Sequence, residues 1–379
     1  MTNPDLKLKV MTVVGTRPEI IRLAATIRLL DEYTNHVLVH TGQNYDYELN
    51  EVFFEDLGLR RPDHFLGANT SSLGAVLGSI LASTEKVLLD EKPDAMLVLG
   101  DTNSCISALI ARRLKVPVYH MEAGNRCFDE NVPEEVNRKL VDHVSDYNLV
   151  YTEHARRNLL AEGIHPSRVT LTGSPMKEVL DGNAEAIADS DVLSRQNLSE
   201  GGYFLVSLHR EENVDNPVRL EQVLCALNEL GREFDLPVLV STHPRTRKRL
   251  EAQPEDLKRG LQFHPPFGFN DYIKLQQSAK LVLSDSGTIS EESLILGFPA
   301  VTLRDSVERP EALDAGGIVT TGLSTEAIID SVRMTLDLHL DRGAASAPWE
   351  YSVSDTSRRT VNFIRSTAHS HHQRAGIRV

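Results

Sequence analysis

The feature that most constrains the fold is an alternation of short apolar runs with segments of helical periodicity, which occurs twice along the chain. The apolar runs that predict buried strands in the first half are 8–14, 37–40, 95–99, 116–119, 148–151 and 169–171. Those in the second half are 204–207, 237–240, 281–284 and 299–302. Such alternation is typical of parallel sheets covered by helices on both faces. The sequence therefore predicts an α/β fold of two Rossmann-like, doubly wound domains with an interdomain cleft.

The chain has 379 residues, more than the roughly 250–300 at which one core usually splits into domains. A polar stretch at 181–196 interrupts the alternation, and we expect the interdomain linker there. The predicted parts are an α/β domain over 1–183, a second α/β domain over 184–355, and a C-terminal helix with a polar tail over 356–379. The end from His369 is expected to be frayed and solvated. A metal site at its histidines is the alternative, which we favour less.

Composition narrows the functional class. The formal net charge is −14, which argues against a surface for nucleic acid or anionic membrane but leaves room for a phosphate site built from a few local cations. Cys105, Cys127 and Cys225 show no paired metal spacing, as in a reduced, cytoplasmic protein. No apolar run reaches the roughly 18 residues of a membrane span. We expect a soluble cytoplasmic protein without membrane insertion.

Acidic residues follow two of the predicted strands in the first half. Asp101 comes after the strand at 95–99, and Glu122 comes after the strand at 116–119. The chain then turns at Gly124 and restarts as a helix at Pro133, with Glu134 in its first turn. Because the carboxyl ends of parallel strands share one crevice, the three acids are predicted to face one cavity and to act as acids and bases. Helix-capping acids are the structural alternative.

Further polar residues follow other predicted strands. The first strand leads through Gly15 into a helix whose N-terminus can hold an anion. His209 and Arg210 follow the strand at 204–207 and suit contact with a phosphoryl or leaving group, although Arg210 can equally pair with a neighbouring glutamate. His243 follows the strand at 237–240, and its role stays open, with helix capping as the alternative.

The segment 284–292 is the most specific motif of the second half. Backbone N–H groups of Ser286, Gly287 and Thr288 are predicted to hold a diphosphate, and Glu292 to accept both ribose hydroxyls. The segment has neither a Gly-x-Gly-x-x-Gly fingerprint nor a Walker lysine, and a plain helix cap is the alternative. Tyr272 is a candidate for stacking on a base, with a core aromatic as the alternative.

Together, these motifs resemble the non-hydrolysing UDP-N-acetylglucosamine 2-epimerases over nearly the whole chain. The motifs that occur in the family's order are 15–19 (GTRPE), 100–102 (GDT), 120–124 (HMEAG), 133–138 (PEEVNR), 209–213 (HREEN), 285–287 (DSG) with 291–292 (EE), and 308–311 (ERPE). The resemblance implies a two-domain glycosyltransferase-B fold. It also implies inversion at carbon 2 of a UDP-linked 2-acetamido sugar, by elimination of UDP and its re-addition, with no cofactor and no metal.

The resemblance also implies roles for individual residues. Asp101, Glu122 and Glu134 form the acid/base set, and His209 joins Arg17 in stabilising the departing diphosphate. The residues implied to bind substrate are Arg17, Arg22, Arg126, Arg210, His243, Tyr272, Ser286, Gly287, Thr288, Glu292 and Arg309. Among these, Ser286 and Gly287 hold phosphate, Glu292 holds the ribose, and Tyr272 contacts the uracil region. Gln43, Arg210 and His243 match positions that hold a second, activating UDP-sugar in some relatives.

The chain also departs from the common family pattern. Arg22 stands where a lysine is common, the loop that begins at Asn125 is shorter, and Val132 replaces a usual tryptophan. This version resembles the branch that acts on modified amino sugars of surface polysaccharides. The resemblance implies a homodimer. The alternatives are a hydrolysing 2-epimerase, a glycosyltransferase of the same fold, and a catalytically silent nucleotide-sugar sensor.

Overall fold

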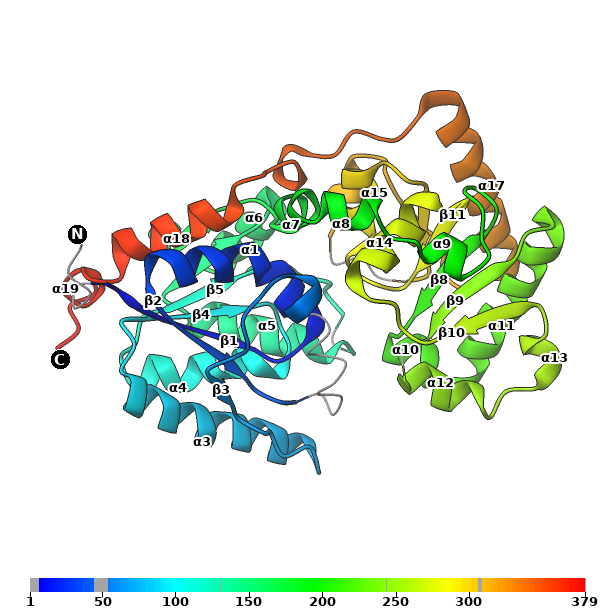
Figure 1. Cartoon of the computed structure of the whole chain (residues 1–379). Coiled ribbons are helices and arrows are strands. Elements are labelled where there is room, and N and C mark those ends of the chain that lie inside the picture. Colours follow the sequence, from blue (N-terminus) through cyan, green and yellow to red (C-terminus); the bar gives the residue numbers. More distant parts are fainter. Residues whose placement is uncertain (1–6, 44–53, 130, 243, 306–308, 379) are drawn as a thin grey trace. The chain divides into compact units, whose positions relative to one another are not determined.

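The computed structural model describes residues 7–43, 54–129, 131–242, 244–305 and 309–378. The chain forms two compact units (Figure 1): unit 1 comprises Met1–Gly182 and Ser352–Val379, and unit 2 comprises Asn183–Tyr351. Each unit contains one sheet, and the strand pairs of both sheets in the described chain are parallel. The prediction of a doubly wound α/β fold is confirmed.

The sheet of unit 1 has the strand order β3-β2-β1-β4-β5-β6-β7. Its strands are β1 (Lys9–Val14), β2 (Asn35–His40), β3 (His64–Phe65), β4 (Ala95–Leu99), β5 (Val118–Met121), β6 (Tyr147–Val150) and β7 (Val169–Leu171). The six predicted strands are present with bounds shifted by at most two residues. The two-residue strand β3 was not predicted, because it is too short to show a pattern.

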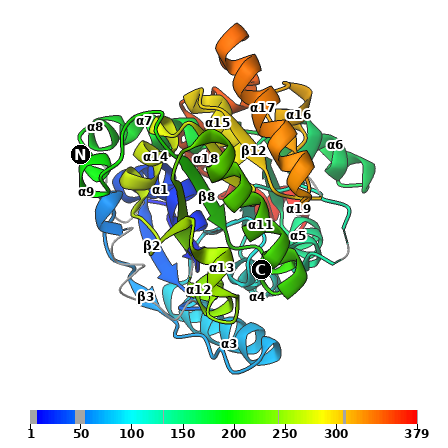
Figure 2. The same cartoon turned by 90° about the vertical axis from the view of Figure 1, so that its right-hand side faces the viewer.

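Helices cover both faces of this sheet. They are α1 (Arg17–Tyr33), α3 (Leu73–Glu91), η2 (Asn103–Ile106), α4 (Ser107–Arg113), α5 (Pro133–Val144), α6 (Glu153–Ala161), η3 (Pro166–Arg168), α7 (Met176–Gly182), α18 (Thr356–Thr367) and α19 (His371–Ala375). Helices α3 and α4 lie side by side, and α1 lies beside α18 (Figure 1, Figure 2). Apolar side chains of β1, β2 and β4 form one core with α3, α4 and α5.

The C-terminal helices belong to unit 1. The Tyr119 hydroxyl lies 2.7 Å from Thr367 Oγ1, and the ring of Tyr147 packs edge-on against Phe363. His371 is buried, with Nε2 3.3 Å from Asp146 Oδ1. The prediction of a frayed end from His369 is therefore wrong for the described residues, since α19 orders this segment against the edge of the sheet.

The sheet of unit 2 has the strand order β10-β9-β8-β11-β12-β13. Its strands are β8 (Phe204–Leu208), β9 (Val238–Thr242), β10 (Leu261–His264), β11 (Leu281–Ser284), β12 (Ala300–Thr302) and β13 (Val319–Thr320). The four predicted strands are present. The edge strands β10 and β13 were not predicted, because half-exposed residues replace the apolar run expected of a buried strand.

Helices also cover both faces of the second sheet. They are α8 (Ala184–Ala188), α9 (Val192–Arg195), α10 (Glu211–Val214), α11 (Pro217–Phe234), α12 (Pro244–Leu250), α13 (Glu255–Lys258), α14 (Phe269–Ser278), α15 (Ile289–Leu296), α16 (Glu311–Asp314), α17 (Thr325–Arg342) and η4 (Trp349–Tyr351). Figure 2 shows α11 and α17, which pack together over one face. Helices α14 and α15 pack over the other face.

The stretch 181–196, expected to be a linker, contains the two short helices α8 and α9 and is held by unit 2. Ser190 Oγ donates a hydrogen bond of 2.5 Å to Asp271 of α14, and Arg195 forms an ion pair of 2.6 Å with the same carboxylate. The polar residues that suggested a loop therefore make tertiary contacts. In the part of the chain that the structure describes, no helix has the length and apolar character needed to cross a bilayer.

Candidate active site

The strand orders define one topological switch point in each sheet, where consecutive connections leave in opposite directions. It lies between β1 and β4 in unit 1 and between β8 and β11 in unit 2. Ligands of open α/β sheets bind beyond the carboxyl ends of strands at such points. Arg17 and Asp101 follow β1 and β4, whereas His209 and Ser286 follow β8 and β11. The predicted site residues thus gather at both switch points.

Asp101 is held by a buried arginine of α5. Arg138 donates from Nε and Nη2 to Asp101 Oδ2, over 3.1 and 2.5 Å. Its Nη1 donates to Glu135 Oε2 over 2.6 Å, and the Glu135 side chain is fully buried. The buried guanidinium thus joins the two carboxylates and fixes the position of Asp101. Arg138 was not predicted as a site residue, although its i, i+3 spacing from Glu135 is visible in the sequence.

Glu122 is paired with a second buried arginine. Its Oε2 lies 3.2 Å from Arg22 Nη1, and both side chains are almost fully buried. The Arg22 guanidinium also lies 5.8 Å from the ring centroid of Tyr151, within cation–π distance. Glu122 has a left-handed backbone with φ of 62°, uncommon for a residue with a side chain. The turn after β5 therefore fixes the carboxylate against Arg22, which the resemblance had placed among the substrate-binding residues.

Glu134 lies in the first turn of α5 and is partly exposed, whereas its neighbour Glu135 is buried. Arg138, four residues later, lies on the same face of the helix as Glu134. Because Arg138 binds Asp101, this face of α5 is turned toward the end of β4. The helix thus brings Glu134 to the same strand ends as Asp101.

A buried ionic network supports the turn after β5. Asp142 of α5 accepts hydrogen bonds of 3.2 Å from the Gly124 amide. The same carboxylate lies 2.9 Å from His120 Nδ1 and 2.7 Å from Arg126 Nη1. Arg126 also forms two contacts of 2.7 Å with Glu162, and its side chain is fully buried. Arg126, which the resemblance places among the substrate-binding residues, is thus held in this network by Asp142 and Glu162.

In unit 2, His209 is oriented by a buried carboxylate. His209 Nδ1 lies 3.0 Å from Asp285 Oδ1, while the His209 side chain is 40% exposed. The backbone amides of His209 and Arg210 each donate to Asp285 over 3.1 Å. Burial raises the pKa of Asp285, but His209 and these hydrogen bonds outweigh burial and hold the pKa below its ordinary value. His209 therefore directs Nδ1 to Asp285 and keeps Nε2 on the opposite edge of its ring.

The loop between β11 and α15 makes internal hydrogen bonds. The Ser286 amide donates to Ser284 Oγ over 3.0 Å, and the Thr288 amide donates to Ser286 Oγ over 3.3 Å. Two of the three amides predicted to cradle a diphosphate are thus bonded to hydroxyls of the loop, which a phosphate must displace. Arg309 donates to Gly287 O and to Glu291 Oε2, each over 3.0 Å. Arg309 therefore stabilises this loop, a role that was not predicted from the sequence.

Glu292 and Tyr272 lie close together beneath this loop. Glu292 is buried and accepts a hydrogen bond of 2.7 Å from Gln276 Nε2. Burial and then the Glu292 carboxylate raise the pKa of Tyr272, whose hydroxyl bonds to the side chains of Ser207 and Gln276. The ring of Tyr272 packs against the core of unit 2. This contact agrees with the core alternative for Tyr272, and its stacking on a base stays a prediction.

The remaining predicted residues are Arg17, Arg210 and His243. Arg17 is the first residue of α1 and is partly exposed, and Arg210 is partly exposed at the end of β8. His243 lies outside the described residues. Within the described segments, no group of three or more His, Cys, Asp or Glu side chains has an arrangement that could hold a metal ion.

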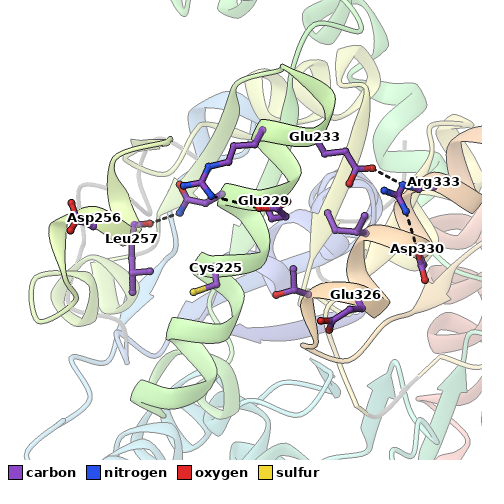
Figure 3. Close-up of a pocket in the computed structure, with 12 residues that line it drawn as sticks. Cys225, Glu229, Glu233, Asp256, Leu257, Glu326, Asp330 and Arg333 are labelled. Carbon is purple, nitrogen blue, oxygen red and sulfur yellow. Dashed lines mark hydrogen bonds and ion pairs between the residues drawn. The ribbon is translucent and has the colours of Figure 1, made fainter.

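A cavity of about 680 Å³ in unit 2 lies away from these residues (Figure 3). It is lined by α11, α13 and α17, and none of its lining residues is a predicted site residue. Three of its charged side chains pair with one another, because Arg333 lies 2.6 Å from Glu233 and 3.3 Å from Asp330 (Figure 3). This cavity therefore supplies no further member of the candidate site.

The fold and these residues define a class of protein. Two parallel sheets carry paired carboxylates and arginines at one switch point, and a histidine with a glycine–hydroxyl loop at the other. This is the framework of α/β enzymes that carry out acid–base chemistry on phosphate-linked substrates.

Within that class, the chain belongs to the UDP-N-acetylglucosamine 2-epimerase family, whose model matches residues 29–365. It is 37% identical over 332 residues to the UDP-2,3-diacetamido-2,3-dideoxy-D-glucuronate 2-epimerase of Pseudomonas aeruginosa, covering 87% of this chain and 92% of the relative. The members of this family are isomerases, and the chain is an enzyme of this kind.

Solved structures agree with this assignment. The UDP-N-acetylglucosamine 2-epimerase of Rickettsia bellii matches with a TM-score of 0.90 and 44% identity, covering 97% of this chain and 98% of that one. The Methanocaldococcus jannaschii UDP-GlcNAc 2-epimerase, solved with UDP-GlcNAc and UDP, matches with a TM-score of 0.87 and 36% identity, covering 95% and 100%. A glycosyltransferase from Rickettsia africae, with a TM-score of 0.54 and 12% identity, shares the fold alone.

Proposed function

We propose that this enzyme inverts carbon 2 of a UDP-linked 2-acetamido sugar by eliminating UDP and adding it back. The family match over residues 29–365 carries the proposal. It is supported by the M. jannaschii relative, whose structure contains UDP-GlcNAc and UDP. The paired carboxylates at the ends of the neighbouring strands β4 and β5 supply groups that suit proton transfer.

The proposed reaction begins with removal of the proton on carbon 2 by one carboxylate of the set Asp101, Glu122 and Glu134. The electron pair of that carbon–hydrogen bond forms a double bond between carbons 1 and 2, and the carbon 1–oxygen bond breaks toward UDP. UDP then re-adds at carbon 1 while a proton is delivered to the opposite face of carbon 2. Arg22 and Arg138 support the proposal, because each pairs with one of these carboxylates and holds it in one orientation.

Departure of UDP places negative charge on the diphosphate, and we assign its stabilisation to Arg17, His209 and the loop at 284–288. His209 supports this role, because Asp285 holds Nδ1 and orients the ring. Cations and helix N-termini that face the leaving oxygen lower the barrier for its departure. Glu292 is proposed to accept the ribose hydroxyls after exchanging its bond with Gln276.

The identity of the sugar is a separate proposal. The P. aeruginosa relative is named for a diacetamido uronic acid, whereas the R. bellii relative is named for UDP-N-acetylglucosamine. The short loop after Gly124 favours a modified amino sugar. We also propose that the enzyme is a cytoplasmic homodimer that serves surface polysaccharide synthesis. A second UDP-sugar is proposed to bind at Gln43, Arg210 and His243.

The function is tested by incubating the purified enzyme with UDP-N-acetylglucosamine and with UDP-2,3-diacetamido-2,3-dideoxy-D-glucuronate and following the sugar signals by proton NMR. We expect the 2-epimer of one of these substrates, with UDP still attached. Free sugar and UDP in equal amounts would instead support the hydrolysing alternative, and transfer to an added acceptor would support a glycosyltransferase.

The carboxylates give the first residue-level prediction. Asp101→Asn, Glu122→Gln and Glu134→Gln should each lower kcat by about 10²-fold or more, since acid–base catalysis contributes on that scale. UDP affinity, measured by calorimetry, should stay within about twofold of that of the wild type, because these residues lie in unit 1. Glu185→Gln, an exposed change on α8, serves as the control. Near-wild-type rates for two of the three variants would place the chemistry elsewhere.

A further inference from the structure

Glu19, in the first turn of α1, makes an unusual set of contacts for a helix residue. Glu19 is 1% exposed, and the donors that bond to its carboxylate are neutral amides and hydroxyls. Both carboxylate oxygens instead face hydrogen-bond donors from two separate loops. A buried carboxylate surrounded by neutral donors is costly unless those donors are fixed in place.

One oxygen of Glu19 holds the loop that follows β1. Oε2 accepts from the amides of Gly15 and Thr16 over 2.8 and 2.6 Å, and from the Thr16 hydroxyl over 2.9 Å. The loop is tightly packed, since a Cβ atom on Gly15 would lie 2.3 Å from Thr41 Oγ1. Arg17, proposed to face the diphosphate, is the next residue after this loop.

The other oxygen of Glu19 reaches the loop that follows β4. Oε1 accepts from the hydroxyls of Thr102, over 3.2 Å, and Ser104. Thr102 also accepts a hydrogen bond of 3.1 Å from Gln43 Nε2 at the end of β2. Thr102 directly follows Asp101, one of the proposed acid–base residues. One carboxylate therefore joins the carboxyl ends of β1 and β4 on the two sides of the switch point.

Helix capping alone does not account for these contacts. A capping box requires a bond from the N3 side chain to the N-cap amide, which Oε2 and Thr16 provide. The bonds of Oε1 to residues more than 80 positions away add nothing to the helix. Burial raises the pKa of Glu19 to about 7, so the fold retains a carboxyl group that is costly to ionise.

We propose that Glu19 is a positioning residue for the epimerase reaction, which locks the Arg17 turn and the Asp101 loop into one geometry. This inference rests on the proposed function of Arg17 and Asp101. Its physical basis is orientation, since a misplacement of about 1 Å at a reacting group costs about 10²-fold in rate.

Two variants of Glu19 separate a positioning role from a role in folding. Glu19→Ala removes both sets of bonds and should lower kcat about 100-fold. Glu19→Gln should keep most of the activity, because its oxygen can accept the two amides while its Nε2 donates to the hydroxyls of Thr102 and Ser104. UDP affinity should fall much less than kcat in both variants, because Arg17 alone, of the groups assigned to the diphosphate, follows the turn that Glu19 holds.

Ser104→Ala keeps the capping box and removes one donor to Oε1, so it tests the connection even if Glu19→Ala fails to fold. We expect kcat to fall about tenfold, with UDP affinity unchanged. Ser107→Ala is the matched control. This nearby buried hydroxyl donates to Ser104 O over 2.6 Å, a bond that does not involve Glu19, and its kcat should equal that of the wild type.

Amide hydrogen exchange provides a readout that is independent of the substrate. Glu19→Ala and Ser104→Ala should increase exchange in residues 100–106, whereas Ser107→Ala should not. Wild-type kcat in both Glu19→Ala and Ser104→Ala, or unchanged exchange in both, would overturn the positioning role. If the wild type itself does not epimerise UDP-sugars, the proposed function fails, and exchange alone decides whether Glu19 joins the loops.

Discussion

At the scale of single residues, carboxylates at the strand ends are paired with cationic partners. Asp101 binds Arg138, Glu122 binds Arg22, and Asp285 binds His209. Each arginine fixes the position of a carboxylate that we propose to transfer a proton. Asp285 has a different task, because it orients a partly exposed histidine. The pairing partner thus distinguishes a group that transfers a proton from one that supports a neighbour.

The Asp285–His209 pair leads to a prediction. Asp285→Asn keeps the shape of the side chain but removes the carboxylate that orients the His209 ring through Nδ1 and accepts from the amides of His209 and Arg210. We expect kcat to fall by about 10- to 100-fold, and nitrogen NMR should show a changed environment of His209 Nδ1. Asp305→Asn in the same unit is the control, since Asp305 is exposed and pairs with Arg219. Equal kcat for both variants would remove His209 from the proposed mechanism.

Glu19 leads to a prediction about pH and stability. Burial raises its pKa from 4.5 to about 7, so the folded state binds this proton more tightly than the unfolded state does. The resulting stabilisation is complete below pH 4.5 and is lost as the pH rises through about 7. At about 1.4 kcal/mol per pH unit, the shift corresponds to about 3 kcal/mol.

Thermal unfolding of the wild type and Glu19→Gln between pH 4.5 and 8 measures this effect. The melting temperature of the wild type should fall relative to that of the variant across the range, because glutamine does not titrate. Parallel curves for the two proteins would show that Glu19 is ionised in the folded protein throughout this range.

At the scale of elements, the turn between β5 and α5 determines where Glu122 lies. Gly124 has a φ of 80°, and a Cβ atom there would lie 2.4 Å from Ala155 O. Its amide also bonds to Asp142. The turn therefore requires glycine for two reasons, the left-handed backbone and the close approach of α6.

A pair of glycine variants separates these two reasons. Gly163 has a similar φ of 86°, but a Cβ atom there meets nothing within 4 Å. Gly163→Ala should cost about 1 kcal/mol of stability from backbone strain alone. Gly124→Ala should cost at least about 2 kcal/mol more and should also lower kcat, because the backbone of the turn must move. Equal melting temperatures would show that the contact with Ala155 relaxes freely.

Much of the element order follows from the sequence, because buried parallel strands are continuous apolar runs. The helices at 217–234 and 289–296 are visible for a similar reason, as apolar residues recur at helical spacing. The strands β3 and β13 have two residues each, and tertiary pairing rather than local pattern defines them. Helices α8 and α9 are short and polar, so their composition suggests a loop. Their contacts with α14 cannot be predicted from composition.

The candidate site was also only partly predictable, because the local sequence reveals residues at strand ends but not contacts between side chains that meet across the fold. Asp101 and Glu122 directly follow strands, and the parallel sheet places such residues together. Arg126 is part of the same motif region but is buried against Asp142 and Glu162. Its pairing depends on α5 and α6, which the local sequence does not reveal. The positions of Arg138 and Glu19 depend likewise on side chains that meet across the fold.

At the scale of the whole molecule, we propose that the two units share the reaction. Unit 1 would supply the acids that act on carbon 2, and unit 2 would supply the histidine and the glycine loop assigned to UDP. Either function alone would give an incomplete reaction, since proton exchange and bond cleavage at carbon 1 must occur in one cycle. A route through elimination therefore requires both events in the same enzyme-bound substrate.

The most direct test of this central claim is the reaction in deuterium oxide with no added cofactor. Proton NMR and mass spectrometry of the epimerised UDP-sugar should show deuterium at carbon 2. The bridging and non-bridging oxygens of the sugar-linked phosphate should also exchange positions, since UDP leaves and returns. Epimerised product that retains its original hydrogen at carbon 2 would contradict the elimination mechanism.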